Sequence, residues 1–311
     1  MNRPLFHIFY IPLVAFVASA PLPAQPIPTH GDEDCSEIAR NYEMIKAAAV
    51  SVQTNMALFA AADRGCEELA RTLLGAGASV LARDRRGAMP LAHAARGGQI
   101  KLVELFLASG APIDARNVDG GTALFAAAQA EKHSTVALLL AKGADPNIPG
   151  RKGDTPLIAA AFKGNDRILE TLIARGASVN AIDETGKSAM VYAAARGFDG
   201  VVQRLLDAGV GARQRYGNDL TALMWAAGHE DGVGAAAAER VIDLLLAHGA
   251  TLNDADNRGR TALMIAASLG DAAVVEMLLR HGADRTLRDK DGKAARDLAA
   301  TRDVRAALAG P

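Results

Sequence analysis

The chain has 311 residues, of which half are hydrophobic and only 4% are aromatic. Its formal net charge of -1 at pH 7 excludes a general attraction to nucleic acid or to an anionic membrane. Because Ala, Leu, Val and Ile supply most of the apolar content, we expect closely packed helices in place of sheets.

The N-terminal region differs in composition from the rest. A basic residue is followed by the apolar run LFHIFYIPLVAFVASA and then by PLPAQPIPTHG. This order predicts a secretory signal peptide over residues 1–24, cleaved after Ala24, and then a disordered linker at 25–34. An uncleaved membrane anchor is the alternative, but the run is short and is interrupted by Pro12. We therefore expect a soluble protein, periplasmic or secreted, that is not inserted in a membrane after signal removal.

A glycine followed by a small residue recurs along the rest of the chain at a fixed interval. The spacing is 33 residues at every step except one, which is 40. The positions are Gly77, Gly110, Gly143, Gly176, Gly209, Gly249 and Gly282. A fixed period of this length predicts a solenoid of stacked repeats.

The stretch 153–181 shows the repeating unit most clearly. Thr155 is suited to cap a first helix that begins at Pro156, and Gly164 ends that helix. A second helix with apolar residues at helical spacing follows and stops at Gly176. Such a unit has two apolar faces and cannot bury both without neighbours.

The period of 33 residues, with its T-P-L, A-A, G and G-A landmarks, strongly resembles the ankyrin repeat family. The resemblance extends over roughly residues 55–308. Its best matches are TPLIAAAFKGN (155–165), PLAHAARGGQ (90–99) and RTALMIAASLGD (260–271). It implies an all-α solenoid with an array of about seven repeats over residues 55–292.

Both ends of the array need covers, because otherwise their apolar faces would meet water. Residues 35–52 are expected to form one helix in the register of a second helix, so 35–54 is predicted to be an N-terminal cap. Residues 293–311 begin like a further repeat but carry added charge, and are predicted to be a C-terminal cap.

The chain has two cysteines, Cys35 and Cys66. An even count in an exported protein favours a disulfide, and the register places both near one edge of the stack. Two independent buried thiols are the alternative. Two cysteines are too few for a structural zinc site, so we expect no metal and no cofactor.

The residue after T-P-L is usually His in the family, but here it is apolar in all seven repeats. We expect these positions to lie in the core: Phe59, Ala92, Phe125, Ile158, Val191, Met224 and Met264. The 40-residue step lies in the sixth repeat, where Gly228 to Gly234 is expected to form a longer loop and Ala235 to Arg240 to extend the second helix. The insertion could contact a partner or could be a tolerated surface feature.

The resemblance also indicates where a partner would bind. The usual surface in the family is the concave side, formed by turn tips and exposed faces of first helices. By register, Phe162, Tyr192 and Trp225 lie on that face in three consecutive repeats. His93 and Ala159 are also expected to lie on the exposed face of their first helices. The other predicted partner-binding residues are Arg151, Lys152, Lys163, Lys187, Arg196 and Tyr216. The alternative is that these rings pack sideways between repeats.

No motif of a nucleophile, a phosphate loop or a metalloprotease occurs, so we predict a binding protein and not an enzyme. Similar exported bacterial ankyrin proteins suggest a periplasmic scaffold that binds a partner protein and supports an enzyme such as a catalase. We expect it to be a monomer. An immunity protein that neutralises a secreted toxic effector is an alternative. A structural spacer without a specific partner is another.

Overall fold

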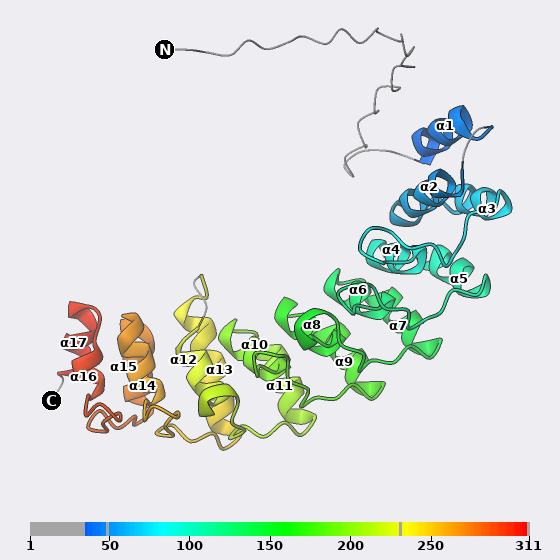
Figure 1. Ribbon diagram of the computed structural model, residues 1–311. Coiled ribbons are helices and arrows are strands. Elements are labelled where there is room, and N and C mark those ends of the chain that lie inside the picture. The colour runs from blue at the N-terminus through cyan, green and yellow to red at the C-terminus, as the bar shows by residue number, and fades with distance from the viewer. Residues whose placement is uncertain (1–34, 48–49, 230–231, 310–311) are drawn as a thin grey trace, which may run out of the picture. The chain divides into compact units, whose positions relative to one another are not determined.

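The computed structural model describes residues 35–47, 50–229 and 232–309 (Figure 1). The predicted signal peptide and linker lie outside these residues. Within them the regular structure is helical, apart from two isolated bridges at Ile182–Ser188 and Arg215–Thr221. No helix in the described ranges has the length and apolar character needed to cross a membrane.

The helices form successive pairs, which we number as repeats one to seven. The pairs are α2 (Ser51–Arg64) with α3 (Glu67–Gly75), α4 (Pro90–Gly97) with α5 (Ile100–Ala108), α6 (Ala123–Gln129) with α7 (His133–Ala141), α8 (Pro156–Lys163) with α9 (Asp166–Ala174), α10 (Ala189–Ala195) with α11 (Asp199–Asp207), α12 (Ala222–Ala227) with α13 (Ala235–Ala247), and α14 (Ala262–Leu269) with α15 (Ala272–Arg280). Helix α1 (Cys35–Ile45) precedes them, and α16 (Ala295–Leu298) and α17 (Arg302–Leu308) follow.

In neighbouring pairs the equivalent helices pack against each other (Figure 1). Each first helix contacts the next first helix, from α2 through α16, and each second helix contacts the next second helix, from α3 through α17. Fully buried alanines such as Ala94, Ala127 and Ala160 let the first helices approach closely. The predicted all-α solenoid with about seven repeats is thus confirmed.

The local signals act as the sequence predicts. The Thr155 hydroxyl accepts a hydrogen bond from the Ile158 backbone N–H at 3.2 Å, and Gly164 and Gly176 adopt left-handed φ values of 70° and 84°. The same cap recurs at Thr122, Ser188, Thr221 and Thr261. Among the apolar residues at the missing His position, Ile158, Val191, Met224 and Met264 are buried, while Phe59, Ala92 and Phe125 are half-buried.

The N-terminal cap differs from the prediction. A single helix over 35–52 is wrong, because α1 ends at Ile45 and α2 begins at Ser51. The first helix of repeat one therefore starts several residues earlier than the register implies, and Met56 lies inside it. Helix α1 packs against α2 and buries Ile38 and Tyr42.

Cys35 and Cys66 form a disulfide, as predicted, with a sequence separation of 31 residues. Cys35 begins α1, and Cys66 precedes the first residue of α3. The bond therefore fastens the cap to repeat one.

We expect reduction, or the substitution Cys35→Ser, to lower the free energy of unfolding by about 3–4 kcal/mol, because the cross-link closes a loop of this length. Urea unfolding with and without reductant measures the difference. Cys35→Ser treated with reductant is the control and should show no further loss. Two titratable thiols in the native, unreduced protein would contradict the bond.

The tips between repeats depend on a side chain that the sequence analysis did not single out. In five tips an Asp or Asn carboxyl or amide oxygen accepts two backbone N–H bonds of its own loop at 2.7–3.0 Å. These residues are Asp84, Asn117, Asp183, Asp256 and Asp289. They share the register of the repeat, so the periodicity could have revealed them.

Two tips lack this residue, and both have a different turn. Gly150 and Tyr216 stand at the equivalent positions, and the short 3-10 turns η1 (Arg151–Gly153) and η2 (Gly217–Asp219) follow them. Without the side-chain acceptor the loop backbone rearranges, and Lys152, Asn218 and Asp219 adopt φ values of 61°, 63° and 59°.

Asp219 stands where six other tips have a glycine with left-handed φ. We expect Asp219→Gly to raise the free energy of unfolding by about 1 kcal/mol, because glycine adopts this conformation without strain. Asp219→Ala removes the same carboxylate but keeps the Cβ, and should not stabilise. Urea unfolding of both variants measures the effect. Equal stabilisation by both would show that charge, and not backbone strain, is responsible.

The insertion in repeat six lengthens its second helix, as predicted. Helix α13 has 13 residues, whereas the second helices of the other six repeats have nine. The added turn begins at Ala235, after the loop residues Gly232 to Gly234.

Candidate functional site

Three aromatic side chains come from three adjacent first helices of repeats four to six. Phe162 lies on α8, Tyr192 on α10 and Trp225 on α12. The Phe162 and Tyr192 rings meet edge to face, with centroids 5.6 Å apart and planes at 78°. Phe162 is 39% exposed, whereas Tyr192 and Trp225 are half-buried and also pack against the core. The rings are therefore partly available and partly structural.

Two cations lie over these rings. The Lys187 ammonium is 5.5 Å from the Tyr192 centroid and 5.2 Å from the Trp225 centroid. The Arg196 guanidinium carbon is 4.2 Å from the centroid of Phe162. At these distances the negative ring faces attract the cations. We call Phe162, Lys187, Tyr192, Arg196 and Trp225 the aromatic–cation row.

Tyr192 also holds the tip that carries Lys187. Its hydroxyl donates to Asp183 at 2.6 Å, and the other Asp183 oxygen accepts from the backbone N–H groups of Thr185 and Lys187 and from the Thr185 hydroxyl. Burial pushes the pKa of Asp183 upward, but these donors outweigh it and hold the pKa below its ordinary value. Burial and the Asp183 carboxylate together raise the pKa of the Tyr192 hydroxyl.

The remaining predicted partner-binding residues lie in different settings. Arg151 and Lys152 are exposed in the tip of repeat four, where Arg151 Nε is 3.8 Å from Asp119 Oδ1. Lys163 is exposed at the end of α8. Burial raises the pKa of the Asp154 carboxyl in the same tip, and the nearby Asp183 raises it further.

Three expectations about exposure are wrong. Tyr216 is 8% exposed and lies in the core, because its tip has the altered turn and its side chain replaces the inward-facing Asp of other tips. His93 is buried between the carboxylates of Asp63 and Asp84, each with an oxygen 3.0 Å from a ring nitrogen. Ala159 is also buried.

The presence of Tyr216 in place of the Asp or Asn of other tips also changes the surroundings of Trp225. Asp183 and Asp84 each bond a side chain nine residues later, namely Tyr192 and His93. Trp225 follows Tyr216 by the same interval but meets no carboxylate there. Its buried indole N–H has no acceptor in the described part of the chain.

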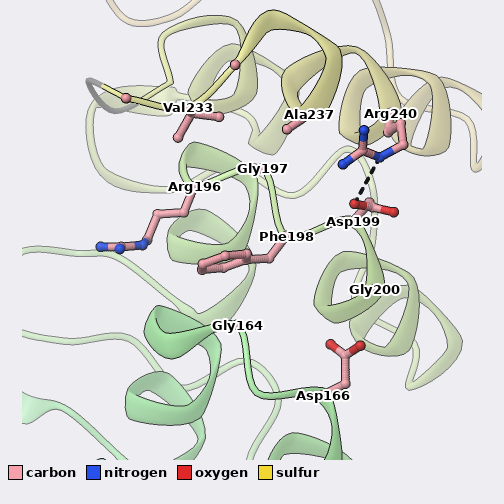
Figure 2. Close-up of a pocket in the computed structure, with 12 residues that line it drawn as sticks. Gly164, Asp166, Arg196, Gly197, Phe198, Asp199, Gly200, Val233, Ala237 and Arg240 are labelled. Atoms are coloured by element: carbon pink, nitrogen blue, oxygen red, sulfur yellow. Dashed lines mark hydrogen bonds and ion pairs between the residues drawn. The ribbon is translucent and has the colours of Figure 1, made fainter.

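A cleft of about 620 Å³ adjoins the row at the turns between first and second helices (Figure 2). Its walls come from repeats four, five and six, including the inserted residues Val233 and Ala237. Arg240 Nε is 3.2 Å from Asp199 Oδ1 within it, as the dashed line in Figure 2 shows. Arg196 lines the cleft beside Phe198, whose ring centroid is 5.6 Å from the guanidinium carbon. Arg196 thus belongs to both the row and the cleft.

Sequence comparison supplies a family for this architecture. The family model described as "Ankyrin repeats (3 copies)" matches residues 58–150, 91–183, 157–235, 191–289 and 233–304. The chain belongs to the ankyrin repeat family. No curated protein matches it.

Ankyrin repeats generally act as interaction modules without catalysis, which indicates a protein–protein interaction scaffold. The described residues contain no group of three or more His, Cys, Asp or Glu side chains that could hold a metal ion. In this ankyrin array the row occupies first helices and one tip, the elements that form the usual partner surface of the family. The sequence alone did not point to Asp183 or Phe198, although Asp183 shares the repeat register with the Asp or Asn of four other tips.

We expect Tyr192→Phe to destabilise the protein by about 1 kcal/mol at pH 7, because it removes a donor from the Asp183 carboxylate. The folded-state pKa of Asp183 is depressed, so its contribution is complete above the unfolded pKa of about 4 and is lost as pH falls through the folded value. The cost of Tyr192→Phe should therefore shrink in strong acid. Urea unfolding at pH 7 and below pH 3 checks this, and an unchanged cost would contradict it.

Proposed function

We propose that this protein is an exported scaffold that binds a partner protein through the aromatic–cation row. The observation that carries the proposal is the continuity of Phe162, Tyr192 and Trp225 across three adjacent first helices, with cations over their faces. Aromatic and Arg side chains are the usual anchors of protein interfaces. A spacer without a partner would not require this concentration of rings in a chain with 4% aromatic residues.

The disulfide of the cap supports the proposed compartment. Disulfides persist in oxidising surroundings such as the bacterial periplasm and are rare in the cytosol. The Cys35–Cys66 bond therefore supports the export that the N-terminal sequence predicts. We place the scaffold in the periplasm, where it acts as a monomer on one partner.

We favour a partner enzyme that the scaffold supports, such as a periplasmic catalase. A captured haem enzyme would be recognised by the haem absorption of the purified complex. A captured toxic effector would instead identify an immunity protein. Genes beside the one for this chain would distinguish the two in the same way.

We expect Phe162→Ala with Trp225→Ala to weaken partner binding at least about 100-fold, because truncated interface anchors cost about 2 kcal/mol or more. The measurement is affinity capture from an extract of the host periplasm, followed by titration of the purified partner. Circular dichroism verifies that the variant is folded, and Phe162→Ala alone serves if the double variant is not.

The matched control is Met56→Ala with Leu269→Ala. Both residues are large, apolar and more than half exposed, at 53% and 61%, and neither belongs to the row. The control should bind as the wild type does. If the partner binds the folded row variant with unchanged affinity, the proposed surface is wrong.

A further inference from the structure

The chemistry of the aromatic–cation row points to the kind of partner segment that it binds. Lys187 has no ion pair with a carboxylate in the residues that the structure describes, although its ammonium lies against two rings. Asp183, whose carboxylate accepts the Lys187 backbone N–H, is buried and also accepts bonds from Tyr192 and Thr185. Within the part of the chain that the structure describes, the Lys187 ammonium therefore has no carboxylate partner.

Other exposed cations lie on the tips and first helices beside Lys187. Lys152 and Lys163 are exposed and also lack an ion pair within the described ranges. In the tips that hold Lys152 and Lys187, Glu184 is exposed, whereas Asp183 is buried and Asp154 is half-buried. The exposed side chains of this region are therefore mainly cationic, although the chain as a whole has a net charge of only -1.

The arrangement of the rings distinguishes between two classes of anionic partner. Stacking of nucleic acid bases needs open ring faces. Here Lys187 covers faces of Tyr192 and Trp225, and Arg196 covers Phe162. The accessible groups are therefore cations framed by rings, which suit carboxylates better than bases.

We propose that the row binds an acidic segment of the partner, with an Asp or Glu carboxylate on the Lys187 ammonium. A second carboxylate would meet Lys152 in the adjacent tip, where the Glu184 N–H donates to the Lys152 carbonyl at 2.8 Å and holds the two tips together. Neighbouring repeats lie about 10 Å apart, which an extended chain spans in about three residues. This inference rests on the proposed function and specifies its partner.

The test uses Trp225, the only tryptophan, as a reporter within the row. The probe is the peptide Gly-Asp-Pro-Ala-Asp-Pro-Gly, whose prolines favour an extended chain. We expect a saturable change in tryptophan emission that weakens with added salt. Lys187→Gln should weaken binding at least about tenfold. Calorimetry gives the Kd without dependence on the starting emission of the variant.

The matched control is Lys142→Gln, which removes the same charge at an exposed position at the end of α7. It should bind the peptide as the wild type does. Equal weakening by both variants, or equal binding of the twin peptide with Asn for Asp, would overturn the inference. Tighter binding of oligothymidylate than of the acidic peptide would overturn it in favour of nucleic acid.

The inference and the proposed function fail in different ways. If capture of the partner depends on Phe162 and Trp225 but is unchanged in Lys187→Gln, the binding surface stands and the acidic segment is wrong. If neither set of variants affects capture, both are wrong.

Discussion

Every helix pair in this protein has apolar surface on two sides, and the rest of the structure follows from that constraint. First helices pack on first helices and second helices on second helices, so each pair depends on its neighbours for burial. The two end pairs lack one neighbour, which is why a covering helix is needed at the start and a short pair at the finish. Binding chemistry is then confined to tips and to helix faces that stacking does not use.

The aromatic–cation row shows how closely stacking and surface are connected. The Tyr192 ring contributes to the row while its hydroxyl fixes the tip through Asp183. Lys187 donates its backbone N–H to the same carboxylate and places its ammonium over two rings. Hydrogen bonds to Asp183 therefore link the tip to the first helix. The position of the Lys187 ammonium depends on this inward-facing carboxylate.

The sequence predicted the fold well because its signals are local and repeated. Thr155, Gly164 and Gly176 act where they stand, and the 33-residue period aligns them. The disulfide was also predicted, because register placed both cysteines at one edge. The repeat register predicted the wrong start for α2, because no repeat precedes this helix to fix where it begins. It also failed for Tyr216, because the direction of that side chain follows from the loss of an Asp that hydrophobic periodicity does not report.

The two ends of the stack are closed by different means. A covalent bond holds the cover of repeat one, whereas packing and backbone hydrogen bonds, such as that from the Ala300 N–H to the Ala267 carbonyl at 3.0 Å, hold α16 and α17 on the last repeat. In a quasi-one-dimensional array, opening propagates from whichever end frays more readily. Amide protons should therefore exchange fastest at the C-terminal end, with protection rising toward the cysteines. Repeats four to six would lie part-way along this gradient, so a bound partner would slow exchange in the repeats that follow it as well as in those it touches.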